Sequence, residues 1–191
     1  RQVFDALDAS AKKHDHKLIS ASASEGTLGR QHLFELLELV DQSPYVYVLE
    51  TNGMTLGDDP EFAQQLARFR NLHVRVSIKG TSPEEYHTLT GARASSYALP
   101  FCALEHLIAA GVSCNACVTV SLSTDEGIER VRERLAAIRP GILTSLELEH
   151  ITLFPKVAKR LREAGITPRA VRHRGRIVHL ENIPTIKGAT Q

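Results

Sequence analysis

The sequence has 191 residues, of which 42% are hydrophobic and 24% are charged, as in an ordinary folded domain with a real core. Its formal net charge of +1 predicts no bulk attraction to nucleic acid or to a membrane, so we expect neither as a partner. No apolar run approaches the roughly 20 residues of a spanning helix, and the three cysteines (Cys102, Cys114 and Cys117) cannot all pair. These features predict a cytoplasmic protein in a reducing compartment.

Short β-branched runs alternate with amphipathic helical patterns along the chain. Helices are predicted at residues 1–14, 31–42, 59–69, 96–110, 123–139 and 154–164, and a further short helix is predicted to begin at residues 82–85. Strands are predicted at residues 17–22, 45–50, 73–78, 112–121 and 143–149. This alternation is typical of parallel βαβ units, so we expect an α/β fold, either an open doubly wound sheet or a full or partial (β/α) barrel.

Cap signals support three of the helix starts. Asp59-Pro60 has an N-cap aspartate before an N1 proline. Two serines are each followed by a glutamate three positions later, Ser82 by Glu85 and Ser123 by Glu126, which is the spacing of a capping box.

The chain after Pro168 has a different composition. Four arginines (Arg169, Arg172, Arg174 and Arg176) follow in quick succession without a clear period. We expect residues 168–191 to be a solvated basic extension of a domain that spans residues 1–167. Contact with an anionic substrate or RNA, and docking across the open edge of the barrel, are the alternatives. No aromatic residue follows Pro168, so this extension lacks the stacking groups of single-strand binders.

Polar residues gather where the predicted strands end. They are Glu25, Glu50-Thr51-Asn52, Ser77 and Lys79, Ser121 and Ser123, and Glu147 and Glu149. A parallel sheet brings such ends to one edge, where α/β folds place their sites. The set lacks a metallohydrolase pattern, a phosphate-binding glycine loop and a nucleophile elbow, and it suits a polar, zwitterionic small molecule.

Several phrases, in this order, resemble the radical S-adenosylmethionine (radical SAM) enzymes: Glu25-Gly26-Thr27-Leu28-Gly29-Arg30-Gln31-His32-Leu33, Glu50-Thr51-Asn52-Gly53, Arg75-Val76-Ser77-Ile78-Lys79-Gly80 and Thr90-Gly91-Ala92. The likeness extends over roughly residues 1–165 and is closest to uncharacterised prokaryotic members. It implies a partial (β/α) TIM-like barrel that binds S-adenosylmethionine beside a 4Fe–4S cluster. It also implies reductive cleavage of that cofactor to a 5′-deoxyadenosyl radical, which abstracts hydrogen from a substrate.

The resemblance assigns roles to particular positions. The Gly-Gly-Glu-Pro motif of these enzymes falls on Ala23-Ser24-Glu25-Gly26, so Glu25 would accept from the methionyl ammonium, with Ser24 beside it. Asn52 and Ser77 fall where ribose contacts are common, and Glu50 precedes Asn52 as a further cofactor-binding candidate.

Two other positions complete the implied cofactor site. Lys79 could reach the carboxylate of S-adenosylmethionine, and Val118, with Val120, would offer an apolar surface to its adenine. Two departures stand beside these assignments. Gly-Gly-Glu-Pro has become Ala-Ser-Glu-Gly, which implies altered binding, and no CxxxCxxC cluster motif occurs in the sequence.

The 4Fe–4S ligands are therefore expected upstream of Arg1, after a first strand that is also missing. The chain begins with Arg1 inside a helical pattern, so we expect a fragment of a longer protein. An electron donor such as flavodoxin or ferredoxin would be a partner, and the substrate and the catalytic residues stay unknown. Within the chain no metal site is expected, because Cys114 and Cys117 should lie on opposite faces of a strand.

Two alternatives stay open. One is a cluster-free barrel that binds S-adenosylmethionine or a nucleotide and has a regulatory or interaction role. The other is an ordinary TIM-barrel lyase or hydrolase, in which Glu50, Lys79 and Glu149 act as acid–base groups. Glu147 and Glu149 share a strand face and could instead line the barrel or pair with an arginine on a helix.

Overall fold

The computed structural model describes residues 1–21 and 24–180. Residues 22 and 23, which belong to the predicted first strand and to the Ala-Ser-Glu-Gly motif, lie outside the described residues, as do residues 181–191 of the predicted extension. In chain order the elements are α1 Gln2–His14, β1 Leu18–Ile19, η1 Gly26–Gly29, α2 Arg30–Asp41, β2 Val46–Thr51, α3 Met54–Asp58, α4 Pro60–Leu66, β3 Leu72–Lys79, α5 Pro83–Thr90, η2 Ala94–Ala98, α6 Leu99–Ala109, β4 Cys114–Thr119, α7 Asp125–Ile138, η3 Pro140–Ser145, β5 Glu147–Glu149, α8 Pro155–Glu163, β6 Ala170–His173 and β7 Arg176–His179.

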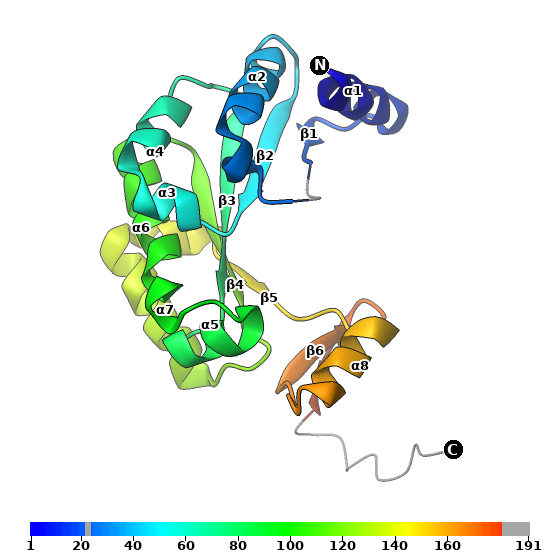
Figure 1. Ribbon diagram of the computed structural model, residues 1–191, viewed down its shortest axis with the longest axis vertical. Coiled ribbons are helices and arrows are strands. Elements are labelled where there is room, and N and C mark those ends of the chain that lie inside the picture. Colours follow the sequence, from blue (N-terminus) through cyan, green and yellow to red (C-terminus); the bar gives the residue numbers. More distant parts are fainter. Residues whose placement is uncertain (22–23, 181–191) are drawn as a thin grey trace.

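Five parallel strands form the main sheet in the order β1-β2-β3-β4-β5, so neighbours in the chain are neighbours in the sheet. Helices α2 to α7 lie on one side of this curled sheet, and the molecule has a C-shaped outline (Figure 1). A doubly wound sheet would reverse its strand order and carry helices on both faces. The partial (β/α) barrel is therefore confirmed.

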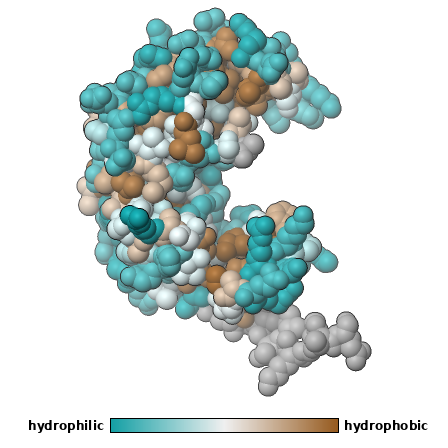
Figure 2. Space-filling view, viewed as in Figure 1, coloured by the Kyte–Doolittle hydropathy of each residue, from teal (hydrophilic) through white to brown (hydrophobic). Residues whose placement is uncertain are grey.

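The two faces of the sheet differ in chemistry because side chains alternate along each strand. On β3, Val74 and Val76 are fully buried under the helices, whereas Arg75, Ser77 and Lys79 point to the other face and are only half-buried. We call this second face the concave face; it looks into the notch that the space-filling view shows between α1 and α8 (Figure 2). Polar side chains at alternate positions thus line the inside of the partial barrel.

The core lies between the sheet and its outer helices. Phe62, Phe101, Leu56 and Leu104 are among its fully buried side chains. Helices α3 and α6 approach each other closely at Gly57, where a Cβ atom would lie 2.2 Å from the carbonyl oxygen of Leu99. None of the described helices is both long and apolar enough to cross a membrane.

The arginine-rich segment is not a solvated extension, as predicted, but an antiparallel hairpin of β6 and β7. Val171 is fully buried, and the backbone N–H groups of Arg169 and Ile151 donate to the carbonyl and the hydroxyl of Ser121, both at 2.7 Å. Because Ser121 follows β4, these bonds fix the hairpin to the carboxyl edge of the sheet. The prediction from composition is therefore wrong for residues 170–179.

Two smaller predictions are also corrected. Residues 143–145 belong to the 3₁₀ helix η3 rather than to a strand, since Ser145 and Thr144 donate their hydroxyls to carbonyls three residues earlier. Helix α7 is capped by Thr124, which accepts from Gly127 N at 3.1 Å, while the Ser123 hydroxyl donates to Glu85.

Candidate functional site

The carboxyl ends of β1 and β2 are joined through one carboxylate, that of Glu25. Its Oε1 accepts from the Thr27 and Thr51 hydroxyls, each at 2.7 Å, and from Thr27 N at 3.3 Å. Among the residues that the structure describes, its Oε2 accepts one bond, from Asn52 N at 2.7 Å. A carboxylate offers about four lone-pair sites, so Oε2 keeps one for a further donor. Glu25 therefore organises this loop and still has room to accept from a ligand ammonium.

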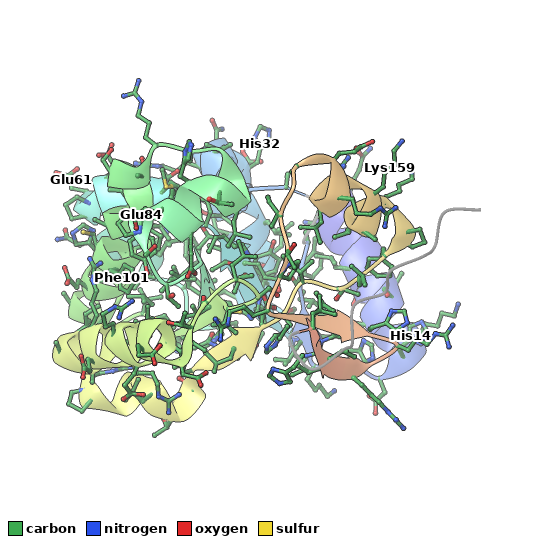
Figure 3. The ribbon with its side chains drawn as sticks, turned by 90° about the horizontal axis from the view of Figure 1, so that it is seen from below. His14, His32, Glu61, Glu84, Phe101 and Lys159 are labelled. Carbon is green, nitrogen blue, oxygen red and sulfur yellow. The ribbon has the colours of Figure 1, made fainter. Side chains whose placement is uncertain are left out.

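A cavity of about 320 Å³ opens next to Glu25. Ser24 and Glu25 line it from the β1 loop, His32 lines it from α2, and Arg1 and Val3 line it from the start of α1. His32 is exposed, at the edge of the molecule in the view of the side chains (Figure 3). Ser24 is exposed there, so the structure brings Ser24 and Glu25 together at one opening.

The Asn52-Gly53 turn that follows β2 is built for close packing. Asn52 Oδ1 accepts from Met54 N at 2.9 Å, and Gly53 has a φ of 74°. A Cβ at Gly53 would lie 2.9 Å from the Cα of Pro100, so both the dihedral and the space require glycine. Asn52 is exposed at the edge of the sheet, and the NH2 group of its side-chain amide has no partner among the described residues.

A second cavity, of about 280 Å³, lies at the ends of β3, β4 and β5. Its polar lining comprises Lys79, Thr119, Glu149 and His150. Lys79 Nζ donates to the Thr119 hydroxyl at 3.2 Å. His150 Nδ1 is the buried side-chain nitrogen that has no hydrogen-bond partner in the described part of the chain. The cavity therefore combines an ammonium, a carboxylate and an unsatisfied imidazole nitrogen.

Arg75 organises the concave face below this edge. Its guanidinium donates to Glu147 at 2.9–3.2 Å, to Glu149 at 2.6 Å and to Glu50 at 3.3 Å. The strand register brings these side chains together. Glu50 lies opposite Arg75 on the neighbouring strand β2, and the two glutamates of β5 reach Arg75 across β4. Three carboxylates around one guanidinium leave this cluster with a net charge of −2.

Ion pairing and burial set the protonation of these groups. Hydrogen bonds from Arg75 lower the pKa of Glu147 against the opposing effect of burial. Burial raises the pKa of Glu149, but bonds from Arg75 and Cys117 outweigh it and the net direction is down. Burial, helped by Glu149, raises the pKa of the Cys117 thiol to about 12, so the thiol is protonated at neutral pH. Burial also lowers the pKa of His150, which is therefore neutral at pH 7.

Most of the predicted site residues lie in one region of the protein. Ser24, Glu25, Asn52, Ser77 and Lys79 all lie at the carboxyl edge or on the concave face.

Glu50 is engaged by another side chain, and Val118 does not fit its expected role. Glu50 pairs with Arg75, which also engages Glu149, so two of the three groups of the lyase alternative are held in ion pairs. Val118 has 0% exposure and lies opposite Ile78 under the helices, so the prediction of an adenine surface there is wrong. Alternation along β4 turns Cys117 and Thr119 to the concave face instead.

The residues present do not form a cluster site. In residues 1–21 and 24–180 no three histidine, cysteine or acidic side chains are placed to hold a metal ion. Cys114 and Cys117 are buried and unpaired, three positions apart on one strand, which turns them to opposite faces. The donor set at the carboxyl edge suits an organic zwitterion instead.

Similarity to known proteins is found at the level of structure. No known family description matches the sequence, and no curated protein matches it. A solved structure titled native anSMEcpe with bound AdoMet and Cp18Cys peptide matches 72% of this chain and 38% of its own, with 24% identity and a TM-score of 0.51. Native anSMEcpe with bound AdoMet matches 91% of this chain and 54% of its own, with 17% identity and a TM-score of 0.53.

The chain thus has the fold of part of anSMEcpe, over about half or less of the length of that enzyme. Both structures are less than 25% identical to this chain, so the likeness is one of fold, and it agrees with the partial (β/α) barrel that the sequence resemblance implied.

Proposed function

We propose that the chain binds S-adenosylmethionine at the carboxyl edge of its sheet, as the cofactor-binding part of a radical SAM enzyme. The observation that carries this proposal is the fold shared with two AdoMet-bound structures of anSMEcpe. The chemistry of the edge supports it, since S-adenosylmethionine presents an ammonium, a carboxylate and a ribose diol to its site.

Each group of the cofactor has a candidate partner. Glu25 Oε2 would accept from the ammonium, adding one charge-assisted bond to the one it accepts from Asn52 N. The exposed amide of Asn52 and the hydroxyl of Ser77 would bind the ribose. Lys79 would lie against the carboxylate of the cofactor. In the described structure its ammonium group donates to the Thr119 hydroxyl alone, so its other N–H groups are open to a ligand.

Beyond cofactor binding, the reaction that we propose is reductive cleavage of the cofactor, followed by abstraction of a hydrogen atom from a substrate. This chemistry requires a 4Fe–4S cluster, whose ligands would come from residues other than these 191. An electron donor such as flavodoxin or ferredoxin would then be a partner. The contribution of this chain is to bind and orient the cofactor and to keep water away from it.

Isothermal titration of the chain with S-adenosylmethionine tests the proposal. We expect saturable one-to-one binding and, for Glu25→Gln, a dissociation constant raised about tenfold, the loss of roughly one charge-assisted bond. Glu61→Gln removes a carboxylate from the outer surface of α4 and should leave the affinity unchanged (Figure 3).

Thermal melting of both variants separates a lost contact from a lost fold. Ser77→Ala provides a second site variant that removes no hydrogen bond of the described structure, and it should weaken binding several-fold. A wild-type chain that retains its fold but shows no binding at millimolar S-adenosylmethionine would contradict the proposal. The lyase alternative predicts that result.

A further inference from the structure

The charges of this protein are separated along the chain. Residues 155–179, which form α8, β6 and β7, contain eight lysines and arginines and one glutamate, a net charge of +7. We call this segment the basic lobe. Since the whole sequence carries +1, the remaining residues carry −6. A charge asymmetry of this size points to a polyanionic partner for one part of the molecule.

The cations of the basic lobe face solvent. Lys159 on α8 points outward in Figure 3, and Arg172, Arg174 and Arg176 on the hairpin are all exposed. Across the described residues, one ion pair falls within the lobe, between Lys159 and Glu163 at 3.7 Å. The three hairpin guanidiniums thus form no ion pair with the described chain and are available to a partner.

The hairpin turn places an arginine where the backbone disfavours one. Arg174 and Gly175 are the two loop residues, and their φ angles of 48° and 78° are both left-handed. Two-residue turns of this kind favour Asn-Gly, because an ordinary side chain meets its own backbone in this region. An arginine at this strained position, where asparagine would be relaxed, points to a functional contact at the tip.

The basic lobe lies beside the candidate site. The backbone N–H groups of Arg169 and Ala170, at the start of β6, donate to the carbonyl of Ser121, directly after β4, so the lobe continues the edge that carries Lys79 and Glu149. Phe154, at the start of α8, is 62% exposed and offers a free aromatic face. A ligand whose phosphates lie along the basic lobe would therefore have its adjoining groups at the concave face.

We propose that the basic lobe is a docking surface for single-stranded RNA. Arginine forks match phosphate oxygens in a bidentate manner, and an exposed aromatic ring stacks on an unpaired base. Duplex DNA keeps its bases stacked and would leave Phe154 unused. A membrane fits less well, because the apolar residues of α8 (Val157, Ala158 and Leu161) are half-buried and leave no free apolar face to insert.

This inference overrides the expectation that the net charge excludes nucleic acid, because that expectation averaged two opposite regions. It is independent of S-adenosylmethionine binding, and the test is carried out without that cofactor.

Fluorescence anisotropy with a labelled RNA of about 12 unpaired nucleotides, between about 50 and 200 mM KCl, tests the proposal on the full chain. We expect a salt dependence of about −0.7 in log K per phosphate neutralised, for several phosphates. Arg174→Asn should weaken binding several-fold and reduce this slope by about one phosphate, while its melting temperature stays the same or rises.

The triple change Arg172→Gln, Arg174→Asn and Arg176→Gln should weaken binding at least tenfold. The control Arg132→Gln removes a half-buried surface arginine of α7, outside the lobe, and should bind as the wild type does. Equal loss in the triple variant and the control would overturn the proposal. Tighter binding of duplex DNA, of an acidic peptide or of phosphatidylserine vesicles than of the RNA would overturn it as well.

Discussion

At the scale of the residue, Arg75 shows how one side chain sets the chemistry of a surface. It is 17% exposed and joins carboxylates from β2 and β5 across the concave face. Hydrogen bonds from the guanidinium lower the pKa of Glu147 and Glu149, so these two stay charged, and the guanidinium keeps its position because carboxylates surround it. The cluster therefore presents a fixed negative surface to whatever enters the partial barrel.

Replacing Arg75 by methionine should raise the pKa of Glu147 from its lowered value to or above its usual range, which a side-chain carboxyl NMR titration measures. The stabilisation that this pairing gives is present above the ordinary glutamate pKa and is lost as the pH falls through the lowered value. The variant should therefore lose about 1–2 kcal/mol at pH 7, and the difference should shrink in acid.

Urea unfolding at pH 7 and in acid measures the difference in stability between the variant and the wild type. Arg132→Met serves as the matched control, because its partner Glu129 lies on the exposed surface at 3.7 Å and the pair should contribute less than about 1 kcal/mol. An unchanged Glu147 titration in Arg75→Met would contradict the role given to this arginine.

Sequence reasoning found some of these residues and missed others for identifiable reasons. Glu25 and Asn52 could be found because each follows a strand within a loop of small residues, and the structure joins them by a hydrogen bond. Arg75 was missed as a site residue although its alternation with buried Val74 and Val76 already placed it on the polar face. The unsatisfied nitrogen of His150 has no sequence signal, because it depends on packing between distant segments.

At the scale of the element, the order of strands and helices was predictable because the apolar periods are strong. The boundaries were less so. Leu143–Glu149 alternates as a strand does, yet its first residues form η3, because Ile142 is buried in the core and local hydroxyl bonds favour a turn. Likewise Thr124 caps α7 although Ser123 has the capping-box spacing, since Ser123 donates to Glu85 in the first turn of α5.

The contact between α3 and α6 gives a prediction at this scale. Gly57→Ala should cost about 1–3 kcal/mol, because the new Cβ would meet the backbone of Leu99 and the helices must move apart. Gly141→Ala is the matched control, since nothing lies within 4 Å of its Cβ position, and it should change the stability by less than about 1 kcal/mol. Equal melting temperatures of the two variants would contradict the close approach.

At the scale of the whole molecule, the C-shaped partial barrel brings two differently charged regions to one notch (Figures 1 and 2). The concave face is acidic around Arg75, and the basic lobe stands at the carboxyl edge beside it. Composition could not predict this, because the net charge of +1 is the sum of the two regions. The hairpin was equally hidden, because its arginines have no apolar period and its anchor is Ser121, far away in the sequence.

The most direct measurement of the central claim is a backbone amide NMR titration of the chain with S-adenosylmethionine. We predict saturable shifts of the amides of Asn52, Ser77 and Lys79, at the ends of two adjacent strands, and no shifts on the outer surface of α7. Absence of shifts at this edge, or shifts confined to residues elsewhere, would contradict the claim that the carboxyl edge of the sheet is the cofactor site.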